Sequence, residues 1–339
     1  MPGIQSEARK IVRRSKLFVP VNREKFLAKA WTRGADCIIL DLEDAIPPAE
    51  KASARRMIKE AIPLVRKGGA EVEVRINREF EAEDLEAILL PGLDCVMIPK
   101  CESAEEIERL DGMVSQLEKD RGLPPGKVQF DLLIETALGI VNVEAIAKAS
   151  LRVAQLNIGQ GDLSIDMGFP RLLELNFEQY FYAENRLLYA ARGANVQACG
   201  LGAQNQVDFT SVSMGEEAMR GACEHACLMG YLGTILIHPG WVKSVNEGYR
   251  PTRDQLDMAR KVKTFLDEAY ARGEGSVTVD GRMYDVANMK HVNYILERAE
   301  AIARREAEKD AALAAAGGIA GPGIPDPGGT GPTRKDEAR

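Results

Sequence analysis

The segment Cys37-Ile-Ile-Leu-Asp41-Leu-Glu43-Asp44-Ala-Ile46 decides the fold, because its apolar run ends in three acidic residues. A strand that is buried on both faces reads as a continuous hydrophobic run. Acids at the carboxyl end of such a strand lie where α/β proteins bind their ligands. A solvated turn or a helix N-cap would explain the same acids, so the rest of the chain has to decide.

Apolar strand-like runs alternate with amphipathic helix-like runs through the first 249 residues. The strand-like runs are 17–21, 38–42, 72–77, 95–100, 128–135, 153–159, 196–201 and 233–238. The helix-like runs are 23–33, 50–65, 81–90, 104–119, 143–149, 172–191, 215–229 and 241–247. Eight β-then-α units favour a single TIM (β/α)8 barrel over two doubly wound α/β domains, and the seventh strand is the weakest of them.

The alternation of strand-like and helix-like runs ends at Tyr249, and Pro251 precedes a helical pattern over 253–272. A strand-like segment, 276–285, and a long helical pattern, 286–315, follow. We therefore predict a barrel over 1–249 that holds the metal and substrate site. We further predict a C-terminal helical lid and oligomerisation module over 250–316, and a disordered Gly/Pro-rich tail over 317–339.

Composition excludes several classes of protein. The 44 Lys and Arg are outnumbered by 51 Asp and Glu, so a net charge of −7 predicts no nucleic-acid partner. No run approaches membrane-spanning length and no signal-like segment begins the chain, which predicts no membrane association and a cytoplasmic location. The six cysteines read as reduced core residues. Cys223, His225 and Cys227 lack the second ligand pair that a zinc site needs.

Polar residues follow nearly every predicted strand, and the carboxyl ends of barrel strands meet on one face. They are found at 20–23, 41–44, 75–77, 99–100, 135–136, 159–162 and 238–239. Glu135 and Asp162 end adjacent strands, and two hard oxygen ligands with room for water and substrate are what Mg²⁺ prefers. Gly159 and Gly161 allow close backbone approach and expose N–H donors to a bound carboxylate. A capping Asp162 and an ion-paired Glu135 are the alternative.

Arg75 ends an alternating segment, Glu71-Val-Glu-Val-Arg75, so it fits either a polar barrel face or a bidentate clamp on a carboxylate. Such a guanidinium would also neutralise a developing oxyanion. Lys51 and Lys100 are weaker candidates. No histidine precedes His225, so acid–base work falls to a carboxylate, to metal-bound water or to a group from elsewhere. No nucleophile elbow, dinucleotide fingerprint or Walker loop is present.

Together these motifs resemble the citrate lyase β-subunit-like proteins of the HpcH/HpaI aldolase group, which includes malyl-CoA and citramalyl-CoA lyases. The resemblance rests on Arg-Ser-Lys-Leu-Phe-Val-Pro at 14–20, on the acidic strand and its approach at 34–45, and on 74–77, 98–100, 134–137, 161–163, 237–239 and 280–285. These motifs span nearly the whole chain in the family's order.

The resemblance implies specific roles. Mg²⁺, with Mn²⁺ as an alternative, would be bound by Glu135 and Asp162, with Asp41, Glu43 and Asp44 around metal-bound water. The lid would cover a neighbouring subunit and bring Asp285 as the acid–base group. The catalytic set would be Arg75, Asp285, Glu43 and Asp44; the substrate would contact Arg75, Gly159, Gln160, Gly161 and Asp162; and Arg23 and Lys51 would lie toward the CoA phosphates.

The implied activity is a carbon–carbon lyase that cleaves or forms a β-hydroxyacyl-CoA, such as malyl-CoA or citramalyl-CoA, through an enolate. Its small-molecule partners would be a 2-oxo acid and an acyl-CoA, and its assembly a homotrimer or homohexamer. A CoA-independent class II aldolase and a β subunit of a larger citrate lyase-like complex are the alternatives. Departures from the family pattern at Val21-Asn22, Gly240-Trp241 and 200–206 leave the acyl carrier and the acid open.

Overall fold

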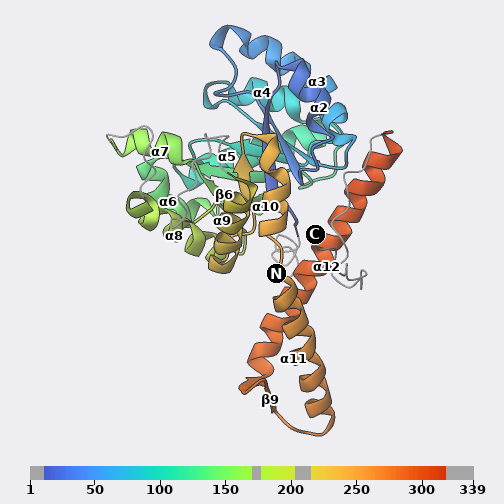
Figure 1. The fold of residues 1–339 in the computed structure, drawn as a ribbon. Helices are drawn as coiled ribbons and strands as arrows, with labels where there is room; N and C mark the ends of the chain where they lie inside the picture. The colour runs from blue at the N-terminus through green and yellow to red at the C-terminus, as the bar shows by residue number, and fades with distance from the viewer. Residues whose placement is uncertain (1–10, 170–176, 203–214, 318–339) are drawn as a thin grey trace, which may run out of the picture. The chain divides into compact units, whose positions relative to one another are not determined.

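The computed structural model describes residues 11–169, 177–202 and 215–317. Eight parallel strands form one sheet, in the order β7-β6-β5-β4-β3-β2-β1-β8 (Figure 1). They are β1 Ser15–Pro20, β2 Cys37–Asp41, β3 Glu71–Arg75, β4 Cys95–Ile98, β5 Gln129–Ile134, β6 Val153–Ile158, β7 Gln197–Cys199 and β8 Thr234–Leu236. Backbone hydrogen bonds from Gly200 N to Gly233 O (2.9 Å) and from Leu232 N to Ala198 O (3.0 Å) join the two edges.

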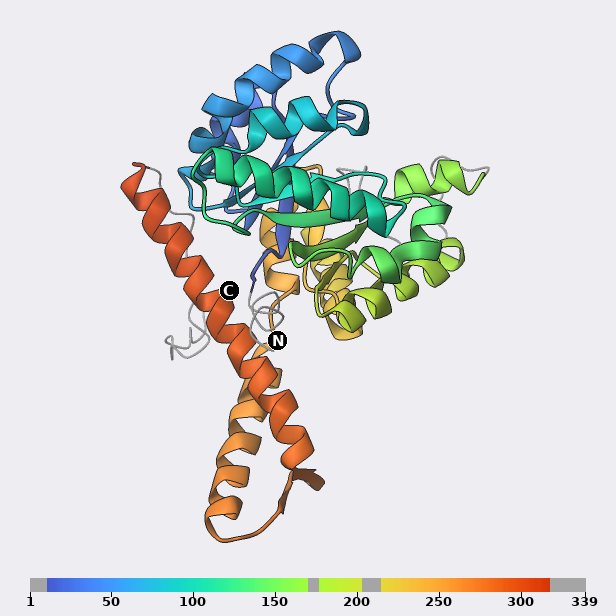
Figure 2. The ribbon, with the colours of Figure 1, turned by 180° about the vertical axis from the view of Figure 1, so that it is seen from behind.

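Helices surround this barrel, as Figures 1 and 2 show from opposite sides. They are α2 Glu24–Ala30, α3 Lys51–Arg66, α4 Glu81–Ile88, α5 Ala104–Asp120, α6 Ala137–Ile146, α7 Gln160–Asp166, α8 Phe177–Ala194, α9 Glu216–Met229 and α10 Val242–Gly248, with short 3-10 turns at Pro48–Glu50, Arg78–Phe80 and Pro239–Trp241. Hydroxyl caps start two of them, since Ser103 accepts from Glu106 N (3.2 Å) and Thr136 from Gly139 N (3.0 Å). The predicted TIM-type barrel is confirmed.

Alternate strand residues face opposite sides of the sheet, and the two sides differ in chemistry. The side facing the helices is apolar: Leu17, Ile38 and Val72 belong to one continuous hydrophobic core with the helices. The side facing the barrel axis carries one apolar layer, made of Ile39, Met97 and Leu133 with Phe18 and Ile235 packed against them. The interior on the amino-terminal side of this layer is polar.

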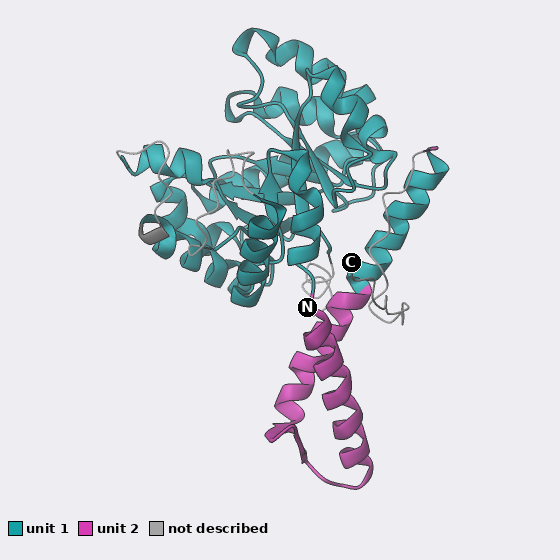
Figure 3. Cartoon of the chain, in the orientation of Figure 1, with its two compact units in different colours: residues 1–250, 301–316 teal, residues 251–300, 317–339 magenta. Residues whose placement is uncertain are grey.

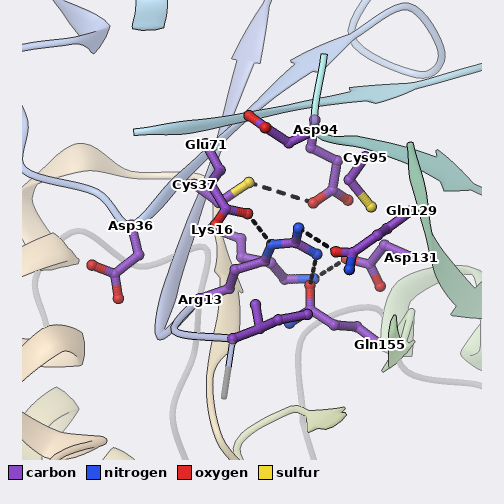
Figure 4. A network of polar contacts seen from close by, with 12 residues as sticks. Arg13, Lys16, Asp36, Cys37, Glu71, Asp94, Cys95, Gln129, Asp131 and Gln155 are labelled. Atoms are coloured by element: carbon purple, nitrogen blue, oxygen red, sulfur yellow. Dashed lines mark hydrogen bonds and ion pairs between the residues drawn. The ribbon is translucent and has the colours of Figure 1, made fainter. Parts of the chain in front are cut away.

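That amino-terminal interior is a network of buried charged and amide groups (Figure 4). The Lys16 ammonium from β1 donates to Asp131 Oδ2 on β5, and both side chains are fully buried. Arg13 donates to Glu71 Oε2 (2.5 Å), Gln129 Oε1 (2.7 Å) and Gln155 Oε1 (3.2 Å). Burial alone would lower the pKa of Lys16, but Asp131 outweighs burial and raises it. The barrel is therefore filled by an ion pair as well as by packing.

Glu73 lies in the same network, and no ion pair involves it among the described residues. It is fully buried, its Oε2 accepts from Cys37 Sγ (3.5 Å), and its Oε1 has no hydrogen-bond partner among the described residues. Burial raises the pKa of Glu73 to about 8, and the neighbouring Asp131 carboxylate adds to the effect. Glu73 is thus held mainly in its protonated form at neutral pH.

The chain divides into two compact units, shown in different colours in Figure 3. The first comprises 1–250 and 301–316, and the described part of the second is Pro251–Glu300. The second unit contains α11 Arg253–Ala271, an antiparallel hairpin of β9 Ser276–Val279 and β10 Arg282–Asp285, and the first half of α12 Val286–Ala315. Asp280 (φ 49°) and Gly281 (φ 77°) form its turn, because a two-residue hairpin favours positive φ at both positions.

The second half of α12 belongs to the barrel unit. Glu306 accepts from Arg14 Nη1 (2.9 Å) and from Arg250 Nη2 (2.6 Å), and the Lys309 ammonium donates to buried Asp36 and to Gly34 O (2.8 Å). Burial opposes ionisation of Asp36, but Arg14 and Lys309 outweigh burial and lower its pKa. The predicted module 250–316 is therefore divided between the two compact units within α12.

The remaining predictions concern helix boundaries, the cysteines, membrane-spanning helices and the C-terminal tail. Helix α6 begins six residues before the predicted 143–149, and the short α7 was not predicted. All six cysteines are free, and five of them are buried. None of the helices in the described ranges combines the length and apolar character that crossing a bilayer requires. The predicted tail after Gly317, the first residues of predicted helix 172–191, and positions 203–206 lie outside the described residues.

Candidate metal and substrate site

The carboxyl ends of five neighbouring strands deliver polar groups to one end of the barrel. Asp41 ends β2, Arg75 ends β3, Lys100 follows β4, Glu135 follows β5, and Gly159 follows β6. The parallel register explains why they meet, since Asp41 pairs with Arg75 across β2 and β3. Asp41, Arg75 and Glu135 are each less than a tenth exposed.

Arg75 is fixed by a set of carboxylates. Its Nε and Nη2 donate to Asp41 Oδ1 (2.7 Å) and Oδ2 (2.6 Å) in a bidentate pair. Its Nη1 donates to Asp44 Oδ2 (3.1 Å) and lies 3.0 Å from Glu43 Oε2. The guanidinium carbon also lies 4.7 Å from the centre of the Phe18 ring. Burial would lower the pKa of Arg75, but its hydrogen bonds to Asp41 raise it, so the group stays charged.

The acidic loop after β2 is held in place from within. Asp41 accepts from Glu43 N (2.9 Å) and Ala45 N (3.2 Å), and Lys51 Nζ donates to Leu42 O (3.0 Å) and to Glu43 O. The Lys51 ammonium therefore binds backbone carbonyls of this loop. Arg23, the other residue predicted to face CoA, is exposed at the start of α2.

Lys100 has a larger place in the site than its ranking in the sequence suggested. Its backbone N donates to Glu135 Oε1 (2.9 Å), and its ammonium pairs with Glu43 Oε1 (3.0 Å). The backbone of Lys100 is left-handed, with φ 50°. Non-glycine residues seldom adopt this conformation, so the sequence carries no signal for it.

Glu135, Gly159 and Asp162 form the acidic centre. A Cβ at position 159 would overlap the Glu135 carboxylate and lie 2.6 Å from Glu135 Cβ, so only glycine fits beside it. Asp162 is half-buried in the first turn of α7. Burial raises the pKa of Glu135 to about 8, with further increases from the negative charges of Asp162 and Glu43.

These residues fit a hard divalent cation. Glu135 accepts only a backbone N–H among the hydrogen bonds of the described residues, and two other carboxylates repel its charge. Within the same residues, no three His, Cys, Asp or Glu side chains converge to hold a metal ion by themselves. Two carboxylate oxygens with the remaining positions left to water and substrate suit Mg²⁺.

The remaining predicted residues occupy distinct places. Gln160 and exposed Gly161 begin α7, and Gln160 Nε2 donates to Glu184 Oε1 (2.9 Å). Asp285 ends β10 in the second unit, where its Oδ1 accepts from Ala287 N (2.9 Å) and Asn288 N (3.4 Å) and so caps α12. The structure thus groups the barrel residues around Glu135, and it shows Asp285 as a cap within its own unit.

Sequence reasoning listed Asn77 only as part of the polar strand end 75–77, and it did not single out Glu184. Asn77 Nδ2 donates to Leu42 O (2.9 Å) and Asp84 Oδ2 (2.8 Å), which fixes the loop behind Arg75. Glu184 is fully buried in α8 and bonds to Gln160. Helical periodicity could have placed Glu184 on a buried face, and an acid on such a face is a signal in itself.

A (β/α)8 barrel with a buried Glu135 and a half-buried Asp162 at the carboxyl ends of its strands has the arrangement of a barrel enzyme. Residues 14–239 match the family model described as HpcH/HpaI aldolase/citrate lyase. The chain belongs to this family of lyases, and the resemblance drawn from its motifs is confirmed.

Relatives of known function are similar over most of the chain. A citrate lyase subunit beta from Leuconostoc mesenteroides subsp. cremoris is 34% identical, over 81% of this chain and 89% of its own. An L-malyl-CoA/beta-methylmalyl-CoA lyase from Cereibacter sphaeroides is 32% identical, over 85% and 95%. The protein CitE from Mycobacterium tuberculosis, solved with magnesium, acetoacetate and coenzyme A, is 26% identical with a TM-score of 0.66, covering 86% of this chain and 99% of that one.

Proposed function

We propose that this protein is an Mg²⁺-dependent lyase that cleaves a β-hydroxyacyl-CoA, such as malyl-CoA or citramalyl-CoA, into a 2-oxo acid and an acyl-CoA, or joins the two. The observation that carries the proposal is the Glu135 carboxylate, which is buried against Gly159, is repelled by the negative charge of Asp162, and forms no ion pair with the described residues. The malyl-CoA lyase relative and the magnesium- and coenzyme A-bound CitE support the choice of substrate and metal.

Glu135 and Asp162 would hold Mg²⁺, or Mn²⁺ in its place. When bound, the ion would act as a Lewis acid toward the oxygens of the 2-oxo acid. Gln160 and Gly161 begin α7 at the same edge, where their backbone N–H groups can bind the acid's carboxylate; the Gly159 N–H, which the sequence also offered as a donor, is instead bonded to Ile134 O (3.0 Å).

Arg75 would stabilise the charge that develops on the thioester. In cleavage, the hydroxyl loses its proton and its carbon becomes the carbonyl of the 2-oxo acid. The breaking carbon–carbon bond leaves its electron pair on the α-carbon of the thioester as an enolate, and protonation of that carbon gives the acyl-CoA. Three hydrogen bonds to Asp41 and Asp44 use three of the five N–H donors of Arg75, and Glu43 Oε2 lies 3.0 Å from Nη1, so the second N–H of Nη2 remains for the enolate oxygen.

Glu43 and Asp44 would keep this guanidinium in place. Glu43 lies between Arg75 Nη1 (3.0 Å) and Lys100 Nζ (3.0 Å), and Asp44 binds Arg75 Nη1 from the exposed side. An arginine held in this way needs no reorganisation as charge develops, which is the main source of electrostatic catalysis.

Asp285 would supply the proton from the lid of a neighbouring subunit in a homotrimer or homohexamer, with Arg23 and Lys51 toward the CoA phosphates. Both capping bonds of Asp285 use Oδ1, and Oδ2 makes no hydrogen bond with the described residues.

Asp285→Asn should therefore lower turnover far more than metal affinity. Mixed oligomers of D285N and R75A chains should regain activity, because some sites would then combine an intact barrel with an intact lid. Mixtures that stay inactive would contradict action across subunits.

The function is tested by incubating the purified chain and Mg²⁺ with malyl-, citramalyl- and β-methylmalyl-CoA while following release of acyl-CoA. We expect turnover of at least one thioester, loss of turnover on chelation, and recovery with Mn²⁺. Glu135→Gln is the matched control. Cleavage of the free hydroxy acids without CoA would favour the aldolase alternative. Folded, Mg²⁺-binding protein that is inactive alone would favour a subunit of a larger lyase.

A further inference from the structure

Glu184 is a fully buried carboxyl group to which the proposed reaction gives no role. It lies in the middle of α8, which packs against β6 and β7. Its Oε1 accepts from Gln160 Nε2 (2.9 Å), and its Oε2 accepts from the Tyr231 hydroxyl (2.9 Å). No ion pair involves it among the described residues, and burial raises its pKa to about 7. Burying a carboxyl group that is bonded only to neutral donors costs folding free energy, so we looked for a role that would explain Glu184.

The reason that we infer is that two residues of α8 form hydrogen bonds with Gln160. Tyr180 and Glu184 are four residues apart and so lie on one face of the helix. The Tyr180 hydroxyl donates to Gln160 O (3.2 Å), while Glu184 binds the side-chain amide of the same residue. Helix α8 therefore holds both the backbone and the side chain of the first residue of α7. Figure 1 shows α7 and α8 on the same side of the barrel.

Glu184 is itself fixed from the opposite side. The Tyr231 hydroxyl lies within hydrogen-bond distance of both Glu184 O (2.8 Å) and Glu184 Oε2. A Cβ at Gly200 would lie 3.2 Å from Glu184 Oε2 and 3.2 Å from the Tyr231 ring, so this position favours a residue without a side chain. The Tyr249 hydroxyl donates to Gly200 O (2.5 Å) and holds that backbone. Gly200 opens the segment after strand seven that departs from the family pattern.

Fixing Gln160 also affects the acidic centre of Glu135, Gly159 and Asp162, because α7 is short and Gln160 lies next to these residues in the chain. Gln160 immediately follows Gly159, which lies against the Glu135 carboxylate, and it precedes Asp162 by two residues. With Nε2 donating to Glu184, the Gln160 amide has a fixed orientation, and its Oε1 is left to accept a hydrogen bond from a ligand.

We propose that Glu184 is a positioning residue that acts through Gln160 to fix the first turn of α7, and with it the Asp162 side chain. The inference rests on the proposed function, because it concerns the same metal and substrate site. Groups behind metal ligands commonly change metal affinity about 10- to 100-fold when they are removed.

The test measures Mg²⁺ affinity by calorimetry on the full chain, so it does not depend on turnover. Glu184→Leu keeps the volume and removes both bonds; Gln160→Ala removes the partner at a half-exposed position that does not threaten folding. We expect each to weaken Mg²⁺ binding about tenfold and the double variant to bind no more weakly than the weaker single one. Glu184→Gln should bind within about twofold of wild type, since its amide can accept from Gln160 and donate to Tyr231.

Glu118→Gln is the control for a purely structural loss. Glu118 is a buried carboxylate of α5, bonded to Arg152 (2.7 Å) and to Gly126 N (2.8 Å) away from the site, so its variant should lower Tm and leave Mg²⁺ affinity unchanged. Wild-type affinity in E184L, or additive losses in the double variant, would overturn the inference alone. A wild-type chain that binds no Mg²⁺ would overturn the inference and the proposed function together.

Discussion

The two ends of the barrel interior use charge in opposite ways. At the amino-terminal end, Asp131 is paired with Lys16, and Arg13 is bonded on three sides by Glu71, Gln129 and Gln155 (Figure 4). At the carboxyl-terminal end, Glu135 accepts one backbone N–H from the described residues and is repelled by Asp162 and Glu43. Matched charges hold the barrel together, whereas the mouth has an excess of negative charge, and there we propose that a cation binds.

Glu73 and Glu135 show this contrast in one residue type. Burial raises the pKa of each to about 8, yet their surroundings differ. Glu73 lies inside a sealed network, so a proton is the only cation that can neutralise it. Glu135 follows β5 beside Gly159, at the mouth of the barrel, where we propose that a divalent cation binds. Equal pKa values therefore predict different chemistry once the position in the barrel is known.

The largest effect is expected from Asp162→Ala. It removes one of the two oxygen ligands, and electrostatic stabilisation by a metal is worth several kcal/mol, so turnover should fall by roughly 10³-fold or more. Asp162 is half-buried and caps no helix with its side chain, so Tm should stay near that of wild type. Steady-state kinetics and thermal unfolding measure the two quantities; unchanged turnover would refute a metal role for this residue.

Lys16→Met should affect the other end of the barrel. The substitution leaves Asp131 buried and unpaired, which typically lowers the free energy of unfolding by about 3–5 kcal/mol. Denaturant unfolding measures this loss, and the folded fraction should keep wild-type affinity for Mg²⁺. Adding Asp131→Leu should recover part of the lost stability, since both charges are then absent. A single variant as stable as wild type would mean that the pair does not hold the barrel together.

A smaller, pH-dependent effect is expected from Glu73→Gln. The folded-state pKa of Glu73 is raised from 4.5 to about 8, so between these values the folded chain keeps a proton that the unfolded chain has lost. Raising the pH through this window should therefore lower wild-type stability relative to E73Q, by about 2 kcal/mol between about pH 6 and 8. Parallel stability curves for the two proteins would show that Glu73 titrates normally.

Much of the fold and part of the site were predictable from local sequence. The alternation in Glu71-Val-Glu-Val-Arg75 predicts a polar barrel face, and Glu71, Glu73 and Arg75 do lie on the inner side. The pairing of Lys16 with Asp131 was not predictable, because the two residues are 115 positions apart and meet only when the barrel closes. Helix α7 was missed because only Leu163 in it is buried, so it has no apolar periodicity.

The central claim is tested most directly by titrating Mn²⁺ into wild type, E135Q and E73Q and following bound ion by electron paramagnetic resonance. Both variants neutralise a buried glutamate of the same barrel whose pKa is raised to about 8. The account predicts one bound ion in wild type and in E73Q, and none in E135Q. Equal binding by all three proteins, or loss of binding in E73Q alone, would contradict it.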